Sequence, residues 1–284
     1  IALAKLMIEL MTTPVEEKLF ELTLRGIDAV KLTKRDLNQE LSLSQMASPY
    51  TGKNSFGASY GEHRAALELS DEEHFEAYKH AKSYGMDFVE TLCAPACLSL
   101  LKLFSPDRLK VASRDLTNLP LLHALAETKI PIIVSTGMAG NKELDAAVEV
   151  ITKYHNNLSI LHCISQYPTE PQNVNLHTIT YLKKYYRDYI IGYSDHTIGI
   201  SAPVAAVALG AEIIEKHITL DRRMRGTDQS GSLEADGVKR MVRDIRLTEM
   251  SLGVEDIFIS ESTNGARRKL ERSIATKVDL NPGD

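Results

Sequence analysis

The chain has 284 residues, which is enough for one large (β/α)8 barrel or for two domains of ordinary size. Its formal net charge of −5 argues against a general nucleic-acid-binding protein, because such proteins are usually basic. No apolar run approaches the roughly 18 residues of a transmembrane helix, so we expect neither a nucleic acid nor a membrane as a partner.

Eight short apolar runs predict strands, and segments with helical periodicity lie between them. The runs cover residues 6–11, 27–32, 87–92, 108–113, 131–136, 158–164, 190–195 and 212–219. Strands that alternate with helices indicate a parallel sheet with right-handed crossovers, and roughly 250 residues is the usual size of eight such units. We therefore expect an α/β fold, a (β/α)8 TIM barrel over residues 1–253, with a doubly wound open sheet as the alternative.

Two stretches interrupt this alternation. Residues 34–69, after the second strand, are rich in Ser, Gly, Asn and Pro, a composition typical of a functional loop or lid. Residues 254–284 are charged and end in Asn-Pro-Gly-Asp, so we expect an arm or linker outside the barrel.

Polar side chains lie at or near the end of every predicted strand. In a TIM barrel the active site lies at the C-terminal ends of the strands, so a polar site is expected there. In chain order these residues are Glu9, Lys31, Thr91, Lys110, Ser113, Asp115, Ser135, Ser165, Tyr167, Ser194, His196 and His217.

Two lysines, Lys31 and Lys110, stand within apolar strands. A buried ammonium is costly unless an anion meets it, so each forms either a structural ion pair or part of a phosphate or carboxylate site. The second interpretation gains support from Ser113, Ser135 and Ser194 at other strand ends, because hydroxyl groups complete an oxyanion cradle.

Two histidines, His196 and His217, end adjacent predicted strands. Such residues are often satisfied core histidines, but two in one mouth also suggest a metal site. Asp195, Glu215 and Asp228 lie near them in sequence, and imidazoles with oxygen donors suit Mn²⁺, Fe²⁺ or Zn²⁺ better than Ca²⁺.

The other cysteines and histidines receive structural interpretations. Three cysteines are too few for a disulfide scaffold, which makes the cytoplasm the expected location. We expect Cys93, Cys97 and Cys163 to be structural, and His74, among other histidines in helical or loop patterns, to lie at the surface.

Several motifs together resemble the sialic acid synthase family, the phosphoenolpyruvate-dependent nonulosonate synthases. The most specific is Gly192-Tyr-Ser-Asp-His-Thr197 followed by Ile214-Glu-Lys-His217. Further matching stretches are Asp28-Ala-Val-Lys31, Tyr60-Gly-Glu-His-Arg64, Leu109-Lys-Val-Ala-Ser113, Ser135-Thr-Gly-Met138, Leu161-His-Cys163 and Tyr167-Pro-Thr169. The resemblance extends roughly from Asp28 to Gly253.

The resemblance implies a barrel that condenses phosphoenolpyruvate with an N-acetylated hexosamine, such as N-acetylmannosamine, to a nine-carbon 2-keto acid and phosphate. It implies that His196 and His217 bind Mn²⁺ or Mg²⁺, and that Tyr167 and Asp228 face the sugar. The residues implied to line the phosphoenolpyruvate site are Lys31, Thr91, Lys110, Ser113, Ser135, Ser165 and Ser194.

The candidate catalytic residues are Asp115, Glu9 and Lys110. A carboxylate can stabilise positive charge at C2 or activate the water that adds there, and Asp115 stands where many relatives carry Glu. Glu9 matches by position only, because Leu10-Met-Thr-Thr-Pro14 replaces the loop usual in the family.

The resemblance also implies a homodimer, with residues 254–284 leading toward an antifreeze-like domain that this chain does not contain. Two other functions stay open: a metal-dependent barrel hydrolase that uses His196 and His217, and a non-catalytic barrel. The sequence does not distinguish sialic, legionaminic or pseudaminic pathways.

Overall fold

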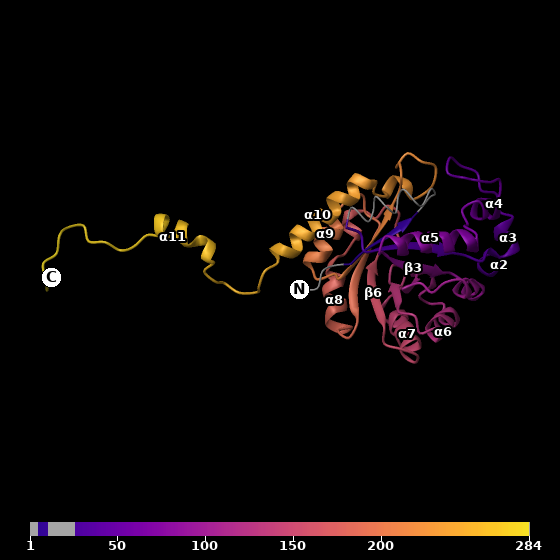
Figure 1. Ribbon diagram of the computed structural model, residues 1–284, viewed down its shortest axis with the longest axis horizontal. Coiled ribbons are helices and arrows are strands. Elements are labelled where there is room, and N and C mark those ends of the chain that lie inside the picture. The colour runs from indigo at the N-terminus through magenta and orange to yellow at the C-terminus, as the bar shows by residue number, and fades with distance from the viewer. Residues whose placement is uncertain (1–4, 11–25, 284) are drawn as a thin grey trace. The chain divides into compact units, whose positions relative to one another are not determined.

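The computed structural model of the chain, shown in Figure 1, describes residues 5–10 as backbone and residues 26–283 in full. The chain divides into two units, residues 1–251 and residues 252–284. Among the described residues, no helix has both the length and the apolar character to cross a membrane. The loop predicted to depart from the family at residues 10–14 falls almost wholly outside the described part.

Parallel strands form the centre of the first unit. They are β1 (Lys5–Leu10), β2 (Ala29–Lys34), β3 (Asp87–Leu92), β4 (Arg108–Val111), β5 (Ile132–Ser135), β6 (Leu158–Cys163), β7 (Ile190–Asp195) and β8 (Ile213–Ile218). Each strand pairs with the next, and β8 pairs with β1, so the sheet closes. The predicted parallel α/β architecture is confirmed. The complete eightfold strand–helix alternation stays a prediction, since residues 11–25 between β1 and β2 lie outside the described part.

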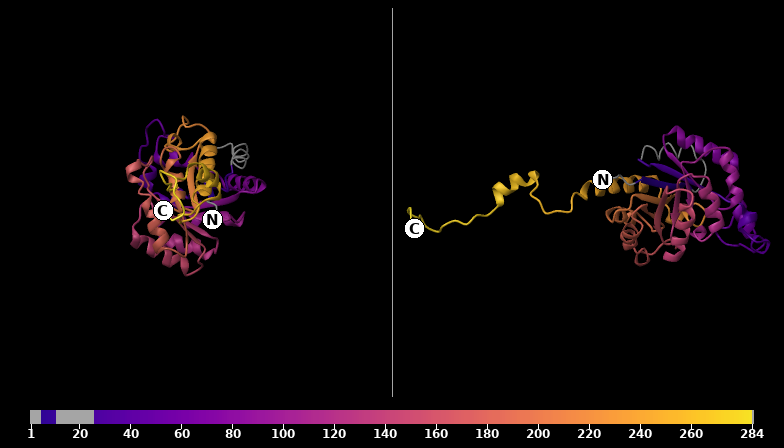
Figure 2. Two further views of the ribbon diagram at one scale, coloured as in Figure 1. Left: turned by 90° about the vertical axis from the view of Figure 1, so that its left-hand side faces the viewer. Right: turned by 90° about the horizontal axis from the view of Figure 1, so that it is seen from below.

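Helices cover the outside of the sheet, as the two views in Figure 2 show. They are α5 (Asp71–Ser83), α6 (Leu119–Glu127), α7 (Asn141–Thr152), α8 (His177–Tyr185), α9 (Ser201–Ala208) and α10 (Ala235–Ser251). A capping box begins α5: Glu73 N–H donates to Ser70 Oγ at 3.2 Å, and Ser70 N–H donates to Glu73 Oε2 at 2.7 Å. The crossover from β3 to β4 is instead the 3₁₀ helix η1 (Pro95–Lys102).

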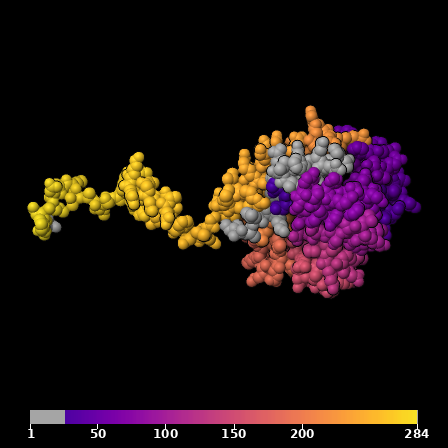
Figure 3. Space-filling view, in the orientation of Figure 1, coloured from indigo at the N-terminus to yellow at the C-terminus, as the bar shows by residue number. Residues whose placement is uncertain are grey.

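The insertion after β2 contains three short helices, α2 (Leu37–Glu40), α3 (Leu43–Met46) and α4 (Tyr60–Ala65). Figure 3 shows it as part of the indigo and purple surface of the first unit. Arg225, from the loop after β8, lies over the ring of Phe56 in this insertion, at 4.1 Å from the ring centroid. The insertion therefore contacts loops at the C-terminal end of the barrel.

The barrel interior changes from apolar to polar along five of the strands, β2, β3, β5, β6 and β8. Nearer the N-terminal ends of the strands lies a small cluster of inward apolar side chains: Ala29, Val89, Ile133, Leu161 and Ile213. Because strand side chains alternate with a period of two, the next inward residue on each strand lies two positions further along. Those residues are Lys31, Thr91, Ser135, Cys163 and Glu215, all buried. The alternation thus builds the polar layer on an apolar floor.

One expectation about the surface is wrong. His74 of α5 is fully buried, and its Nδ1 lies 3.0 Å from Glu90 Oε2 on β3. This pair joins the helix to the outer face of the sheet, where burial raises the pKa of Glu90 and the His74 hydrogen bond acts against that rise.

The second unit contains η5 (Glu261–Thr263) and α11 (Asn264–Leu270). None of its described residues, 252–283, is buried. Its expected role as an arm or linker stays a prediction.

Candidate active site

Lys31 and Lys110 both approach one buried carboxylate. The Lys31 ammonium lies 3.2 Å from Glu215 Oε1, and the Lys110 ammonium lies 3.6 Å from Glu215 Oε2. Lys110 also donates to Ser135 Oγ at 2.6 Å and to the Val111 carbonyl at 3.0 Å. Two ammonium groups therefore meet at one carboxylate within the polar layer. Both can also donate to a phosphate or carboxylate group bound at this end of the barrel.

Hydroxyl groups gather around Gly137, just after β5. Gly137 N–H donates to Ser113 Oγ at 2.9 Å. A Cβ atom at this glycine would lie 2.8 Å from Ser113 Oγ, 2.4 Å from Ser165 Oγ and 2.9 Å from Cys163 Sγ. A larger residue would displace these groups, so the glycine lets three strand ends approach each other.

The other two predicted phosphoenolpyruvate residues follow from strand register. Ser194 of β7 pairs with Glu215 of β8, and Thr91 of β3 pairs with Lys110 of β4. The Thr91 hydroxyl is buried and has no hydrogen-bond partner in the described part of the chain. An unsatisfied buried hydroxyl beside a lysine is what a site for an oxygen-rich ligand requires.

The two predicted metal residues and the two predicted sugar residues line one cavity. The His196 and His217 ring centroids are 5.3 Å apart, and the Tyr167 ring lies 4.1 Å from His196 and 6.1 Å from His217. The cavity lining comprises Tyr167, Pro168, Asp195, His196, His217, Thr227, Asp228, Ser230 and Gly231. The structure therefore brings together residues from the ends of β6, β7 and β8.

The donor set fits an open metal site. His196 Nδ1 lies 3.0 Å from the Ile164 carbonyl, so this nitrogen donates and leaves the Nε2 lone pair available to a metal. Within the described residues no group of three His, Cys, Asp or Glu side chains could hold a metal. Two imidazoles from His196 and His217 would leave coordination positions for substrate or water oxygens.

Two carboxylates grouped with these histidines on sequence grounds have other partners. Asp195 pairs with Lys216 at 2.6 Å and accepts hydrogen bonds from the Tyr193 hydroxyl and the Thr197 N–H. Glu215 pairs with the lysines already described. Asp195 and Asp228 both line the cavity, but among the described ion pairs Asp228 has no lysine partner.

Cys163 is buried, as predicted, and it lies beside one of the predicted metal residues. Its Sγ lies 3.7 Å from His196 Nδ1. Burial acts to raise the pKa of the thiol, but His196, Ser113 and Lys110 outweigh it and lower the pKa below its ordinary value. The predicted position in the core is confirmed, and the inward spacing two residues after Leu161 is the signal that could have shown its contact with the site.

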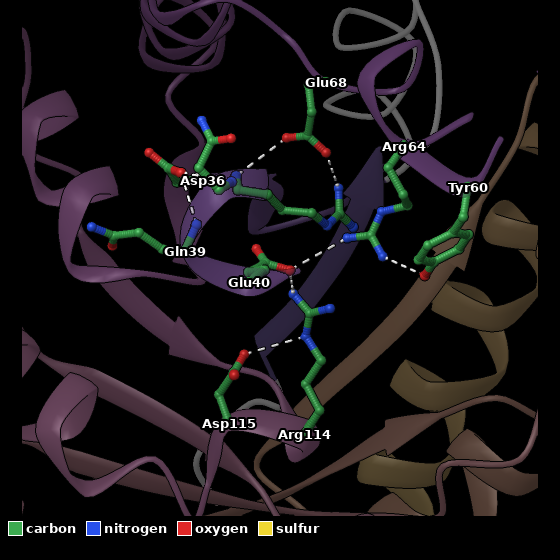
Figure 4. A network of polar contacts seen from close by, with 10 residues as sticks. Asp36, Gln39, Glu40, Tyr60, Arg64, Glu68, Arg114 and Asp115 are labelled. Carbon is green, nitrogen blue, oxygen red and sulfur yellow. Dashed lines mark hydrogen bonds and ion pairs between the residues drawn. The ribbon is translucent and has the colours of Figure 1, made fainter. Parts of the chain in front are cut away.

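Asp115 lies just after β4 in η2 (Ser113–Asp115), within the network drawn in Figure 4. Its Oδ2 accepts from Arg114 Nε at 3.3 Å. Burial raises the pKa of the Asp115 carboxyl, and Arg114, followed by Lys110 and Arg35, acts against this rise. Sequence reasoning placed Lys110 nearby but missed Arg114, although it directly precedes Asp115.

Glu9 is described as backbone only. It pairs in register with Lys31 on one side and His217 on the other. Its position in the ring thus lies between the two predicted sites, and its assignment as a catalytic residue stays a prediction.

Comparisons with known proteins agree with this arrangement. The sequence model of the NeuB family matches residues 22–256. The N-acetylneuraminate-9-phosphate synthase of Homo sapiens is 34% identical over 258 residues, covering 91% of this chain and 72% of the relative. The N,N'-diacetyllegionaminic acid synthase of Legionella pneumophila is 34% identical over 264 residues, covering 91% of this chain and 74% of the relative.

A solved structure shows the same likeness in three dimensions. It is the N-acetylneuraminic acid synthetase of Leptospira borgpetersenii in complex with citrate, with a TM-score of 0.80 and 27% identity. The match covers 95% of this chain and 93% of that one. The chain therefore belongs to the NeuB family and, like the synthases that it matches, is an enzyme of the transferase type.

Proposed function

We propose that the enzyme condenses phosphoenolpyruvate with the aldehyde form of an N-acylated amino hexose. The products are a nine-carbon 2-keto sugar acid and inorganic phosphate. The observation that carries the proposal is the convergence of the Lys31 and Lys110 ammonium groups at Glu215, because two buried lysines in one place suit the recognition of a small, highly charged anion. The names of the relatives, which make N-acetylneuraminate 9-phosphate and diacetyllegionaminate, supply the sugar class.

The two halves of the site suit the two substrates. Phosphoenolpyruvate would bind at the lysines, with hydroxyl donors from Thr91, Ser113, Ser135, Ser165 and Ser194. The sugar would bind in the adjoining cavity, between Tyr167 and Asp228. This arrangement would hold C3 of phosphoenolpyruvate next to the aldehyde carbon, and such alignment is a large part of catalysis for two-substrate reactions.

The reaction forms one carbon–carbon bond and breaks one carbon–oxygen bond. C3 of phosphoenolpyruvate attacks the aldehyde carbon, whose oxygen takes a proton. Positive charge develops at C2, where water adds and phosphate then departs. Asp115, when ionised, would stabilise the charge at C2 or accept a proton from the water, and Lys31 and Lys110 would hold the departing phosphate. Mn²⁺ or Mg²⁺ held by His196 and His217 would polarise the aldehyde oxygen as a Lewis acid.

A metal-dependent hydrolase would use the same histidines but has no need of two lysines on one carboxylate. The test is release of inorganic phosphate from phosphoenolpyruvate with Mn²⁺ present. The sugars to compare are N-acetylmannosamine, its 6-phosphate and a diacetamido-trideoxyhexose. We expect release that depends on one of these sugars and a product heavier than the sugar by a three-carbon keto acid. Release without any sugar, or none with any of them, would overturn the proposal.

A further inference from the structure

Glu40, the last residue of α2 in the insertion, accepts hydrogen bonds from two arginines. Its Oε2 accepts from Arg114 Nη2 at 2.9 Å and from Arg64 Nη2 at 3.4 Å. The Glu40 side chain is only 10% exposed. Arg64 is held in turn by the Tyr60 hydroxyl at 2.9 Å, and Figure 4 shows both arginines pointing toward the one carboxylate. The insertion thus brings an acidic group against the end of β4.

Arg114 connects this group to Asp115. One edge of its guanidinium, at Nη2, donates to Glu40, and Nε donates to Asp115 at 3.3 Å. The guanidinium is planar and rigid, so the contact at one edge sets the direction of the donor at the other. The contact with Glu40 is also the shorter of the two, and it joins residues 74 positions apart. The insertion therefore restrains a side chain that holds Asp115.

We propose that Glu40 is a positioning residue, which holds the Arg114 guanidinium in the orientation that keeps the Asp115 carboxylate directed into the active site. The inference rests on the proposed function, because it assumes that Asp115 takes part in the condensation. Glu40 acts through Arg114 and is not assigned a contact with either substrate. The insertion would therefore contribute to catalysis by orienting Arg114, in addition to lying beside the active site.

The charged groups around Asp115 determine the direction in which the loss of Glu40 would shift the pKa of Asp115. Arg114 and Lys110 from the β4 segment and Arg35 from the end of β2 lower the pKa of Asp115 against the effect of burial. Glu40 is the negative group facing it from α2. Burial raises the pKa of the nearby Cys93 thiol to about 12, so that thiol is neutral at working pH.

Two roles of Glu40 would therefore shift the pKa of Asp115 in opposite directions. If Glu40 acted only as a nearby charge, its removal would lower that pKa. If Glu40 positions Arg114, its removal weakens the Arg114–Asp115 contact and raises that pKa. Because Asp115 works when ionised, its pKa sets the acidic limb of the pH–rate profile.

The experiment measures kcat and kcat/KM for phosphoenolpyruvate against pH in Glu40→Ala, Glu40→Gln and the control Glu76→Ala. Glu76 is an exposed carboxylate of α5 that pairs with Lys79 at 2.7 Å, with no described contact to Arg114, Arg35 or Asp115. We expect Glu40→Ala to lower kcat roughly 10-fold and to move the acidic limb up by about half a pH unit to one unit. Glu40→Gln should shift less, because its amide oxygen still accepts from Arg114. Glu76→Ala should change neither quantity.

A double-mutant comparison separates this inference from the proposed function. Adding Glu40→Ala to Asp115→Asn should cost no further activity if Glu40 acts through Asp115. A further 10-fold loss in that background, or an acidic limb that stays in place or moves down in both Glu40 variants, would overturn the positioning role while leaving the condensation intact. Thermal unfolding of each variant checks folding, and Glu40→Gln carries the test if Glu40→Ala is unstable. A wild-type enzyme without sugar-dependent phosphate release would overturn the proposed function and this inference together.

Discussion

Asp195 and Lys216, the residues immediately before the two cavity histidines, are paired in strand register and joined by a buried ion pair of 2.6 Å. Both side chains are almost fully buried. The pair ties the ends of β7 and β8 together one residue below His196 and His217. It therefore fixes the relative height of the two imidazoles.

Lys216→Met is expected to destabilise the fold strongly. It leaves the Asp195 carboxylate buried without its cation, which typically costs about 3–5 kcal/mol of the free energy of unfolding. Denaturant unfolding followed by circular dichroism measures the loss. Lys153→Met is the control, because its ion pair with Glu149 is exposed at the surface and should contribute below about 0.5 kcal/mol. Equal losses in the two variants would contradict the role given to the buried pair.

Lys110→Ala is expected to weaken phosphoenolpyruvate binding more than sugar binding. The ammonium lies among Ser135, Glu215 and the Val111 carbonyl in the proposed anion site. Loss of a charge-assisted contact should cost about 1.5–3 kcal/mol, which appears as a raised KM for phosphoenolpyruvate. Lys82→Ala, which removes a lysine paired with Asp107 outside the barrel, is the control. A raised KM for the sugar alone would reverse the assignment of the two substrates.

Activity is expected to require a divalent metal held by His196 and His217. Chelation should abolish phosphate release, and Mn²⁺ should restore it. His217→Ala should behave like the chelated enzyme, because one imidazole and solvent hold a metal poorly. Calorimetric titration with Mn²⁺ measures binding independently of turnover. His155→Ala serves as control, because this histidine lies between the end of α7 and the start of β6. Full activity after exhaustive chelation would exclude the metal.

The pattern of apolar runs predicted the strands closely, except where contacts between loops determine the residue at which a strand ends. The apolar runs 87–92 and 190–195 coincide with β3 and β7 at both ends. The run 108–113 is longer than β4, which ends at Val111. The chain turns into η2 there, where the Ser113 hydroxyl accepts from Gly137 N–H of another loop. Such a contact between separate strand ends leaves no trace in local periodicity.

The candidate site was likewise predictable in part: the sequence indicates which side chains converge, but not which partners they contact. Period-two alternation places Lys31, Ser135 and His217 on the inner face, so their convergence could be foreseen. The partners of the charged side chains could not be foreseen. Glu215 contacts two lysines from other strands, and Glu40 binds Arg114, which lies 74 positions away in the sequence. A carboxylate near a histidine in sequence is an equally good candidate for a metal ligand or a lysine partner, and only the three-dimensional register decides between them.

We expect the enzyme to be a homodimer. The family resemblance implies a site built across two subunits. In the second unit the apolar side chains of Ile257, Phe258 and Ile259 are exposed, and contact with another chain would bury them. Sedimentation equilibrium at enzyme concentrations used in assays measures the assembly. A strictly monomeric chain with normal turnover would contradict the expectation.

The acidic limb of the pH–rate profile is expected to belong to Asp115. Burial raises the pKa of this carboxyl, and Arg114 acts against the rise. Since the ionised form is the working form, activity should fall as pH drops through that raised pKa, at a higher pH than for an exposed aspartate. Asp115→Asn removes the charge and keeps the shape, so the acidic limb should disappear. We expect kcat to fall about 10²–10⁴-fold, the usual range for a general acid–base group, with phosphoenolpyruvate still bound.

Asp115→Glu is the matched variant, because the synthases that this sequence resembles often carry Glu at the position. It should retain much of the activity, since the carboxylate remains and gains one methylene of reach. Isothermal titration with phosphoenolpyruvate shows whether each variant still binds substrate, which separates lost chemistry from lost binding. If Asp115→Asn turned over normally with an unchanged pH profile, Asp115 would be structural. The carboxylate to test next would then be Glu9, whose backbone pairs in register with both Lys31 and His217.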